Sequence, residues 1–251
     1  MSPLDVTQPL PPRASIEQEA ALLQERYGAL SGEALLKPLL RDELEGRVAI
    51  VSSFGAESAV LLHIAAAIDP SVPVIFIDTG KLFGETLRYR DQLIQMLGLQ
   101  DVRVVGPARQ TEASRDRAGN LWARDPGACC QFRKVEPLRK ALAGFPAWIS
   151  GRKRYQGGER AQLPAIELAD GKIKLNPLAS WSRPQIQAEF DARNLPRHPL
   201  EADGFLSIGC VPCTDRVASG EDVRAGRWRG MVKTECGIHQ RWSDGPAPSK
   251  R

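Results

Sequence analysis

The sequence lacks any hydrophobic stretch long enough to cross a membrane, and its N-terminal residues contain no apolar segment typical of a secretory leader. It also lacks a long run of Lys or Arg, so the net charge of +4 is spread along the 251 residues. A spread positive charge favours a small anionic substrate over a nucleic-acid tract. We therefore expect a soluble, cytoplasmic protein that binds neither a membrane nor nucleic acid.

The sequence has no internal repeat and no Gly-rich loop with the lysine of a Walker A motif, which argues against a P-loop NTPase. With 42% hydrophobic residues, the chain can bury one substantial core. We expect a disordered lead over residues 1–14, a single domain over 15–242 and a flexible tail over 243–251. Within the domain, a regular core over about 45–195 should precede an irregular segment, rich in Gly and Pro, over about 196–242.

Short apolar runs alternate with helical patterns along the core. Runs at 47–51, 72–77, 102–105 and 147–150 predict strands, and the patterns between them at 57–68 and 85–97 predict helices. This alternation indicates an α/β fold with a doubly wound, mostly parallel sheet and helices on both faces. Because ligands collect at the carboxyl ends of such strands, the loops after Val51, Ile77 and Ile149 should converge on one cleft.

The remaining segments are less regular. Residues 15–40 predict two short helices and residues 183–193 another helix, whereas 106–128 predict a long loop or an insertion of short helices.

The loop from Ser52 to Ser58 lies between a predicted strand and a predicted helix. Its small residues allow backbone N–H groups to approach a phosphate, and the start of a helix favours an anion. Residues 53–58 resemble the Ser-Gly-Gly-x-Asp-Ser loop of the adenine-nucleotide PP-loop fold, with Phe54 in place of a glycine and Glu57 in place of the aspartate. We expect the Phe54 ring to alter the cavity that would hold pyrophosphate, which argues against ATP pyrophosphate cleavage. Glu57 could equally complement the helix dipole.

The five cysteines divide into a group of four and one that stands alone. Cys129 and Cys130 are adjacent, Cys210 and Cys213 form a Cys-x-x-Cys motif in a turn, and Cys236 lies in Glu-Cys-Gly-Ile-His. Cytoplasmic proteins seldom use cysteines for disulfides, so metal binding or catalysis is the favoured use. Four thiolates can complete a metal centre, and Cys236 is left free to act as a nucleophile.

The adjacent cysteines distinguish between the centres that four thiolates can hold. Zinc usually takes its ligands from two separated pairs, and adjacent thiolates can hardly both reach one small ion without distorting the backbone. The iron atoms of a cubane cluster are spread further apart, so neighbouring thiolates can bind different corners. We expect one 4Fe-4S cluster on Cys129, Cys130, Cys210 and Cys213. Zinc, a redox disulfide and two pairs that never meet remain alternatives.

The ordered set of motifs resembles the assimilatory adenylyl-sulfate (APS) reductases, of the family shared with phosphoadenylyl-sulfate (PAPS) reductases, over about residues 47–239. The motifs are Ser52-Ser-Phe-Gly-Ala-Glu-Ser58, Ile77-Asp-Thr-Gly80, Cys129-Cys-x-x-Arg133-Lys134, Cys210-x-x-Cys213 and Glu235-Cys-Gly-Ile-His239. The paired cysteines resemble the cluster-bearing branch, which usually uses APS. The segment from Gly151 to Arg160 departs from the shorter Gly-x-Arg-Arg signature of relatives, which leaves open which of its arginines meets the substrate.

The resemblance implies a PP-loop fold and a mechanism. Cys236 would attack the sulfur of the sulfonucleotide, expelling AMP and leaving a cysteine S-sulfonate, from which a thioredoxin or glutaredoxin dithiol would release sulfite. Cations would favour the thiolate and stabilise charge on the leaving group, and Gly237 indicates a segment that closes and opens. The implied substrate contacts are Ser52, Ser53, Phe54, Gly55, Ser58, Asp78, Gly80, Lys134, Gly151, Arg152, Arg224, Arg227 and His239.

Several of these residues have a purely structural alternative. His239 could be an exposed residue on a tail, Arg224 and Arg227 a solvated basic turn, Lys134 a helix-surface lysine and Asp78 a turn former. Of the other histidines, His63 is expected in the core and His198 in a structural role. The tryptophans at 122, 148, 181 and 242 are expected to pack rather than to stack on adenine.

Three other functions compete with APS reduction. A PAPS-reducing or dual-specificity enzyme would need only one or two further cations for the 3′-phosphate. An ATP-dependent PP-loop enzyme carrying a cluster would need an intact Gly-Gly loop and a broad basic surface, which the sequence does not show. An iron–sulfur redox sensor or binding module would explain four cysteines but not Cys236 or the nucleotide loop. The sequence is also compatible with a homo-oligomer.

Overall fold

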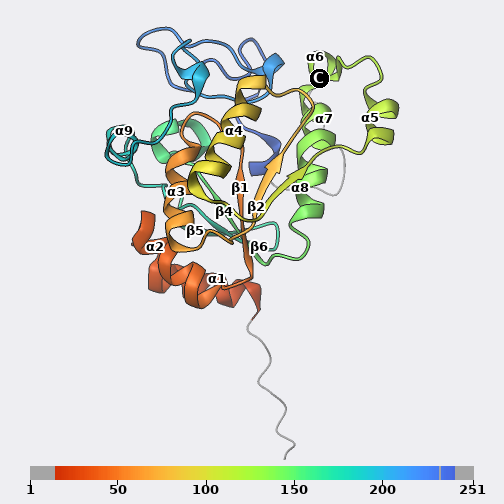
Figure 1. Ribbon diagram of the computed structural model, residues 1–251. Helices are drawn as coiled ribbons and strands as arrows, with labels where there is room; N and C mark the ends of the chain where they lie inside the picture. The colour runs from red at the N-terminus through yellow and green to blue at the C-terminus, as the bar shows by residue number, and fades with distance from the viewer. Residues whose placement is uncertain (1–14, 232, 241–251) are drawn as a thin grey trace, which may run out of the picture.

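The computed structural model describes residues 15–231 and 233–240, so the predicted lead over 1–14 and tail over 243–251 lie outside the described residues. Its centre is a six-stranded sheet in the order β3-β2-β1-β4-β6-β5 (Figure 1). Every pair in the sheet is parallel except that of the last two strands. The strands are β1 (Val48–Ser52), β2 (Val74–Ile77), β3 (Val102–Val105), β4 (Ala147–Ser150), β5 (Ile166–Ala169) and β6 (Lys172–Leu175). The prediction of a mostly parallel sheet is confirmed.

The hairpin of β5 and β6 is the part of the sheet that the sequence analysis missed. Asp170 and Gly171 connect the two strands with φ values of 54° and 68°. Two consecutive positive φ values are typical of the tight turns that join antiparallel strands, and Asp-Gly is a favoured pair there. The sequence signal was present, because apolar and polar residues alternate on both sides of this pair.

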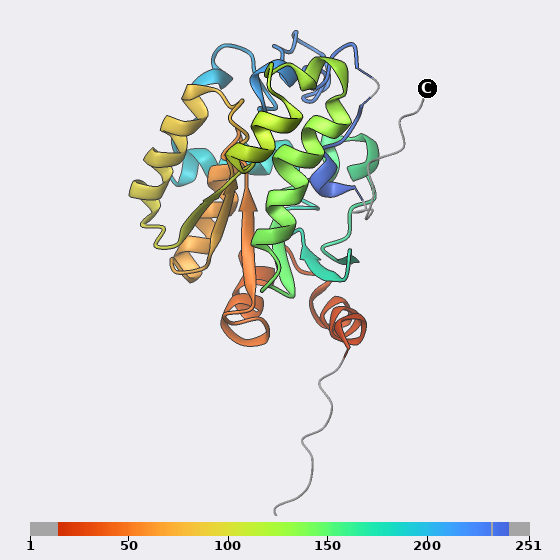
Figure 2. The same ribbon diagram turned by 90° about the vertical axis from the view of Figure 1, so that its right-hand side faces the viewer.

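Alternate residues of the strands face two different helical layers. Val48 and Ile50 of β1 belong to the larger core cluster, and Ala49 and Val51 to a smaller cluster. The larger cluster is covered by α1 (Ile16–Tyr27), α2 (Gly32–Pro38), α3 (Ser58–Ile68), α4 (Gly84–Leu97) and α9 (Arg183–Ala192). The smaller one is covered by α8 (Glu136–Ala141), in the group of helices that faces the viewer in Figure 2. No helix in the described part of the chain is long and apolar enough to cross a bilayer.

The insertion after β3 consists of short helices, which was one of the two alternatives predicted for residues 106–128. It contains α5 (Arg109–Arg115), α6 (Leu121–Arg124) and α7 (Pro126–Cys130), and a π-helical turn over Gln131–Val135 connects α7 to α8. Asp125 begins α7, because its side chain accepts the Ala128 N–H at 2.8 Å and Pro126 follows at the first helical position. This start places Cys129 and Cys130 in the last turn of α7.

The segment from Pro196 to Gln240 is irregular, as predicted, apart from 3₁₀ turns at Pro199–Glu201, Val211–Cys213 and Gly237–His239. It crosses the end of the sheet to which the parallel strands point (Figures 1 and 2). An isolated bridge between Leu82 and Cys210 holds it against the loop after β2. The chain thus closes the strand ends with residues that are distant in sequence.

His198 anchors the start of this segment. It is 1% exposed, and the Leu200 backbone N–H donates to its Nδ1 at 3.2 Å. The neutral ring therefore carries its proton on Nε2, which lies 3.1 Å from Thr86 Oγ1. Burial lowers the pKa of His198 from 6.5 to about 4. Its predicted structural role is consistent with these contacts.

This lowered pKa predicts a loss of stability in acid. His198 binds a proton near pH 6.5 in the unfolded chain but only near pH 4 in the folded protein. Proton binding to the unfolded chain therefore lowers the free energy of unfolding as the pH falls from 6.5 toward 4, and has little effect above pH 6.5. In His198→Asn, the amide oxygen can still accept the Leu200 N–H but does not titrate. Its free energy of unfolding in urea should fall by about 2 kcal/mol less between pH 7 and pH 5 than that of the wild type. Thr86→Val keeps the His198 ring and should keep the pH dependence of the wild type. An unchanged pH dependence in His198→Asn would show that the lowered pKa of His198 is not its cause.

Candidate active site

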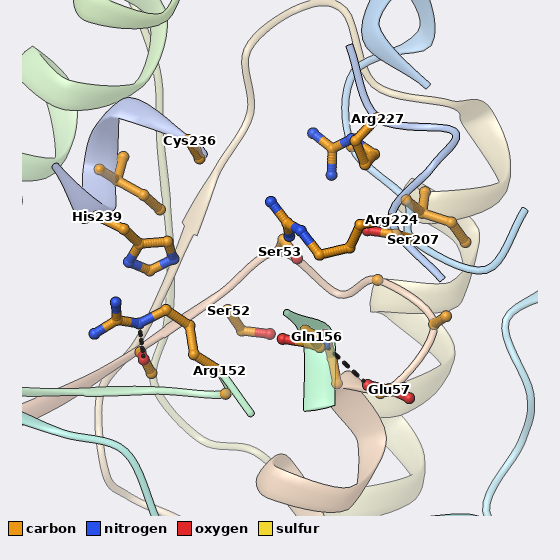
Figure 3. A pocket seen from close by; sticks show the side chains of 18 of the residues that line it. Ser52, Ser53, Glu57, Arg152, Gln156, Ser207, Arg224, Arg227, Cys236 and His239 are labelled. Atoms are coloured by element: carbon orange, nitrogen blue, oxygen red, sulfur yellow. Dashed lines mark hydrogen bonds between the residues drawn. The ribbon is translucent and has the colours of Figure 1, made fainter. Parts of the chain in front are cut away.

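A pocket opens at the carboxyl ends of the strands, where the sequence analysis predicted a cleft (Figure 3). Ser52 and Ser53 line it from the end of β1, Thr79 from the loop after β2, and Ser150 and Gly151 from the end of β4. The irregular C-terminal segment forms its other side, and a Cβ on Gly55 would lie 3.4 Å from the Ile208 carbonyl oxygen. The predicted convergence of the three loops is confirmed.

Most of the predicted site residues line this pocket. They are Cys236, Ser52, Ser53, Gly55, Ser58, Lys134, Gly151, Arg152, Arg224, Arg227 and His239. Figure 3 shows Cys236 and His239 on one side of the pocket, with Arg224 and Arg227 on the other.

Phe54 belongs to the core rather than to the pocket, which corrects the expectation that its ring alters the cavity. The ring is fully buried and packs edge-to-face on Phe76 with 5.4 Å between the centroids. The backbone at Phe54 is left-handed, with φ at 46°, and this turn carries the side chain away from the loop's open side. The pocket keeps the small residues on both sides of Phe54 as its lining.

Asp78 and Gly80 also lie outside the pocket lining. The Asp78 carboxylate accepts the Gly80 backbone N–H at 2.9 Å, and Gly80 has a φ of 68° that a side chain would strain. The two residues shape the turn after β2, the structural alternative considered for Asp78. Thr79 between them is the residue of this motif that reaches the pocket.

The loop after β1 carries a buried ion pair that the sequence analysis did not foresee. Glu57 accepts Lys153 Nζ at 2.8 Å and Gln156 Nε2 at 3.2 Å, and the Tyr155 hydroxyl also donates to it. Burial raises the pKa of Glu57, but Lys153 and these hydrogen bonds outweigh burial and lower it overall. Glu57 makes no capping bond to its own helix. It therefore presents an ionised carboxylate at the nucleotide loop.

The arginines between 152 and 160 take different directions. Arg152 lines the pocket, and its Nε donates to Ser150 Oγ at 3.3 Å while Glu167 accepts from Nη2. Burial lowers the pKa of Arg152. Arg154 turns away and donates to the Leu163 carbonyl at 2.8 Å. Arg160 lines the pocket and pairs with Glu235, a contact that the sequence analysis did not predict. Arg152 and Arg160 are thus the two arginines of this segment that line the pocket.

Trp228 supports the cations contributed by the C-terminal segment. The guanidinium of Arg227 lies 4.4 Å and that of Arg224 5.5 Å from the centroid of its ring, and Arg227 Nε donates to the Cys213 carbonyl at 3.2 Å. Burial, followed by Arg160, lowers the pKa of Arg224 to about 10. The segment is not helical, yet both arginines are held at the pocket rather than in a solvated turn.

His239 is enclosed rather than exposed on a tail. Its ring stacks on Trp148, with 5.9 Å between centroids and 3° between planes, and its buried Nδ1 has no hydrogen-bond partner among the described residues. Burial and the charges of Lys174, Arg152, Arg160 and Arg224 hold the pKa of His239 well below 6.5. A neutral imidazole with a free ring nitrogen is available to a ligand in the pocket.

The four cysteines of the predicted metal centre are buried, reduced and adjacent to one another. Burial, followed by the neighbouring thiols, raises the pKa of Cys129 to about 12 and that of Cys213 to about 11. Thr79 Oγ1 lies 3.2 Å from Cys210 Sγ. The thiols of each pair are among the groups that raise the pKa of the other pair, so the two pairs lie near each other. Within residues 15–231 and 233–240, no three His, Cys, Asp or Glu side chains are placed to hold one metal ion.

The surroundings of the four thiols fit anionic sulfur ligands. Arg133 is 1% exposed and donates to the Thr79 carbonyl and to Asp116 at 2.7 and 2.8 Å, while its buried Nε has no partner among the described residues. Cys129 is among the groups that raise the pKa of Arg133. An unpaired donor beside buried thiols matches the need of a metal-bound thiolate for hydrogen bonds.

Lys134 and Cys236 connect these cysteines with the pocket. Burial lowers the pKa of Lys134, but the charges of Cys210, Cys236 and Cys130 outweigh burial and raise it. Lys134 also lines the pocket. Cys236 is half-buried at the pocket wall, and a Cβ on the adjacent Gly237 would lie 3.9 Å from the Cβ of Cys130. The fifth cysteine thus faces the pocket beside the other four.

Comparison with known proteins identifies the family of the chain. A model of the phosphoadenosine phosphosulfate reductase domain matches residues 47–216. Over 224 residues the chain is 50% identical to an adenosine 5′-phosphosulfate reductase of a Chelativorans species and 48% identical to that of Mesorhizobium japonicum, covering 89% of this chain and 91% and 88% of those proteins. It is 40% identical over 222 residues to a phosphoadenosine 5′-phosphosulfate reductase of Gloeobacter violaceus, covering 86% of this chain and 92% of that one.

Solved structures show the same fold. The crystal structure of PAPS reductase from Candida auris superposes with a TM-score of 0.66 at 24% identity, covering 82% of this chain and 99% of that one. Yeast FAD synthetase superposes with a TM-score of 0.50 at 17% identity, covering 80% and 75%. The chain belongs to the phosphoadenosine phosphosulfate reductase family and has the α/β fold of the adenine-nucleotide PP-loop type.

Proposed function

We propose that this protein reduces adenylyl sulfate to sulfite and AMP, with Cys236 as the nucleophile. The observation that carries the proposal is a free, half-buried cysteine on the wall of a cation-lined pocket, in a chain up to 50% identical to proteins named adenosine 5′-phosphosulfate reductase. We place the protein in the cytoplasm, where its thiols stay reduced.

The charge of the pocket supports a small anionic substrate. Among the described residues, six cationic side chains and two carboxylates line it. The cations are Lys134, Arg152, Lys153, Arg160, Arg224 and Arg227, and the carboxylates are those of Glu57 and Glu235. A phosphosulfate group would be drawn to this excess of positive charge.

The first step transfers the sulfonate group. The Cys236 thiolate attacks the sulfur of the substrate, an S–S bond forms, and the bond from that sulfur to the bridging oxygen breaks with its electron pair on the departing AMP. Arg224, Arg227 and Lys134 lie where they can stabilise the charge that develops on the leaving phosphate. The neutral ring of His239 can hydrogen-bond to the same group. The product on the protein is a cysteine S-sulfonate.

The second step returns the protein to its thiol form. A thiolate of an external dithiol, of the thioredoxin or glutaredoxin type, attacks Cys236 Sγ and expels sulfite, which leaves with the electron pair of the S–S bond. The second thiol of the reductant then releases Cys236 and forms the reductant's disulfide. The dithiol supplies both electrons, so no other electron donor is needed. Cys236 must be reachable from outside, and its place in an irregular segment at the end of the sheet is compatible with that.

Cys129, Cys130, Cys210 and Cys213 would hold one 4Fe-4S cluster. The donor set, its burial and the unpaired Arg133 Nε fit such a group. When bound, a cluster would add a large local charge beside Lys134, which shares its surroundings with both the cysteines and the pocket. The residues of the chain perform the sulfonate transfer itself.

A redox sensor without turnover is the competing function. It would use the four buried cysteines but would give no role to Cys236 at the wall of a cation-lined pocket. Removal of Cys236 separates the two functions. A reductase should lose sulfonate transfer and keep its metal, whereas a sensor should be unchanged.

Cys236→Ser should lower sulfite formation at least about a thousandfold, because the serine hydroxyl is a far weaker nucleophile at neutral pH. Without reductant, the wild type should release one AMP per chain and carry an SO₃ group on the peptide that contains Cys236, as detected by mass spectrometry. The variant should retain the iron and sulfide of the wild type, which controls for folding. Sulfite formation at the wild-type rate in the variant would refute the assignment.

Glu57→Gln should shift the substrate preference toward PAPS. With the sulfonate at Cys236, we expect the nucleoside end to lie toward the loop after β1, where the Glu57 carboxylate lines the pocket and would repel an added 3′-phosphate. The substitution removes this charge and leaves Lys153 uncompensated. The ratio of kcat/KM for PAPS to that for APS should rise about tenfold. An unchanged ratio would show that Glu57 does not select the substrate.

Anaerobically purified protein should contain about four iron atoms and four acid-labile sulfides per chain. Cys210→Ala should lose most of both, because it removes one of the four thiolates that would bind the cluster. Cys236→Ser is the matched control, since it removes a thiol that would not bind iron. Zinc in place of iron, without sulfide, would exclude the cluster.

A further inference from the structure

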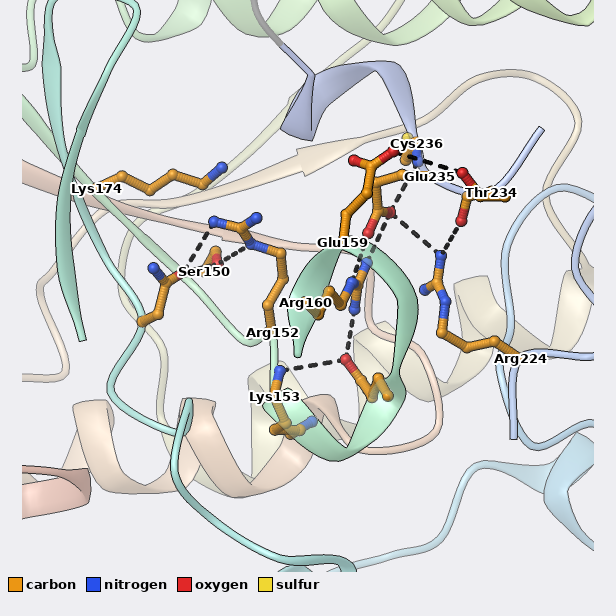
Figure 4. Close-up of polar contacts among 12 residues, drawn as sticks. Ser150, Arg152, Lys153, Glu159, Arg160, Lys174, Arg224, Thr234, Glu235 and Cys236 are labelled. Atoms are coloured by element: carbon orange, nitrogen blue, oxygen red, sulfur yellow. Dashed lines mark hydrogen bonds and ion pairs between the residues drawn. The ribbon is translucent and has the colours of Figure 1, made fainter. Parts of the chain in front are cut away.

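Glu235, which directly precedes the nucleophile, is buried among cations. Its side chain is 4% exposed and forms a two-point contact with Arg160, from Nε to Oε2 at 2.5 Å and from Nη2 to Oε1 at 2.8 Å. Parallel N–H bonds to both carboxylate oxygens are the strongest form of this ion pair. Arg160 comes from the loop after β4, so the pair connects the core to the C-terminal segment (Figure 4).

The same carboxylate reaches two further groups. Arg224 Nη2 donates to Oε1 at 3.2 Å and to the Thr234 carbonyl at 3.1 Å. The Cys236 backbone N–H donates to Oε1 at 2.8 Å. One oxygen thus accepts from both arginines and from the nucleophile's own backbone, so the position of Cys236 depends on this carboxylate.

The two arginine contacts differ in strength. Arg160 makes two short bonds, whereas Arg224 makes one longer bond through a nitrogen that it shares with the Thr234 carbonyl. An anion that enters the pocket will draw the more weakly held guanidinium first. Burial raises the pKa of Glu235, but Arg160, Arg224 and the Cys236 N–H outweigh it and lower the pKa to about 2, so this competitor is charged at neutral pH.

We propose that Glu235 is a positioning residue that holds Cys236 in place through Arg160 and, in the free protein, occupies Arg224 until the substrate's phosphosulfate displaces it. This inference rests on the proposed function. It assigns different tasks to the two arginines: Arg160 stays on Glu235 and fixes the nucleophile, and Arg224 moves from the protein's carboxylate to the substrate's anion.

Substrate affinity and reaction rate should therefore change in opposite directions in Glu235→Gln. Without the charge, Arg224 is free to bind the substrate, so the Kd for APS, measured in a Cys236→Ser background where nothing is consumed, should tighten about threefold to tenfold. The Cys236 backbone is held less firmly, so the single-turnover rate of AMP release, measured with Cys236 intact and without reductant, should fall about tenfold. A loss of folding alone would weaken both.

Glu159→Gln is the matched control. Glu159 is an exposed carboxylate next to Arg160 that accepts from Thr234 Oγ1 at 3.5 Å (Figure 4). Its replacement by glutamine therefore removes the same charge from the same region. Both the Kd and the rate should stay within about twofold of the wild type. Glu235→Asp keeps the charge on the arginines but shortens the reach to the Cys236 N–H, so its rate should fall without a gain in affinity. Weaker binding by Glu235→Gln, or an unchanged rate, overturns the inference.

A third measurement needs no substrate. Iodoacetamide should alkylate Cys236 at least about threefold faster in Glu235→Gln than in Glu159→Gln, because the segment around Cys236 is held less firmly. The alkylation of the Cys236 peptide is followed by mass spectrometry. Equal rates overturn the inference whatever the substrate proves to be. Faster alkylation, in a protein whose wild type forms no S-sulfonate with APS, supports the positioning role and overturns the proposed function instead.

Discussion

The gathering of six cationic side chains of the described residues at one pocket is the constraint on which the rest of this structure depends. Like charges in a partly buried cavity repel each other strongly, and the lowered pKa of Arg224 shows the effect of burial and of Arg160. The protein offsets this repulsion with Glu57 and Glu235, with the aromatic face of Trp228 and with the buried thiols around Lys134. What remains is an excess of positive charge that an anionic substrate can neutralise. Affinity for a phosphosulfate and the fold of the C-terminal segment are therefore two results of one electrostatic balance.

The cysteines lie beside one of these cations. Lys134 shares its surroundings with Cys130, Cys210 and Cys236, and it also lines the pocket. The charge of Lys134 therefore interacts with the cysteine group, with Cys236 and with any anion in the pocket. Thr79, which contacts Cys210 and lines the pocket, is a second such link. A change in the charge of the four-cysteine group would therefore act on a substrate in the pocket through Lys134 and Thr79.

Local patterns in the sequence predicted the core of the fold and the cleft. Both depend on residues close in the chain: apolar runs such as 47–51 and the small residues around Ser53. The contacts between Glu57 and Lys153 and between Arg160 and Glu235 could not be predicted in this way, because their partners are 96 and 75 residues apart. The prediction that the Phe54 ring alters the cavity was wrong for another reason. The direction of the ring depends on a left-handed backbone that is rare outside glycine. The hairpin of β5 and β6 was missed although its Asp-Gly turn was visible.

Anaerobic sulfite release should be measured first, with APS and PAPS in parallel, thioredoxin as reductant and protein shown to contain iron and sulfide. We expect rapid sulfite release with APS and a much lower kcat/KM with PAPS. Equal or better turnover of PAPS would preserve the chemistry of Cys236 but contradict the role given to Glu57. No sulfite from either substrate would contradict the proposed reaction itself.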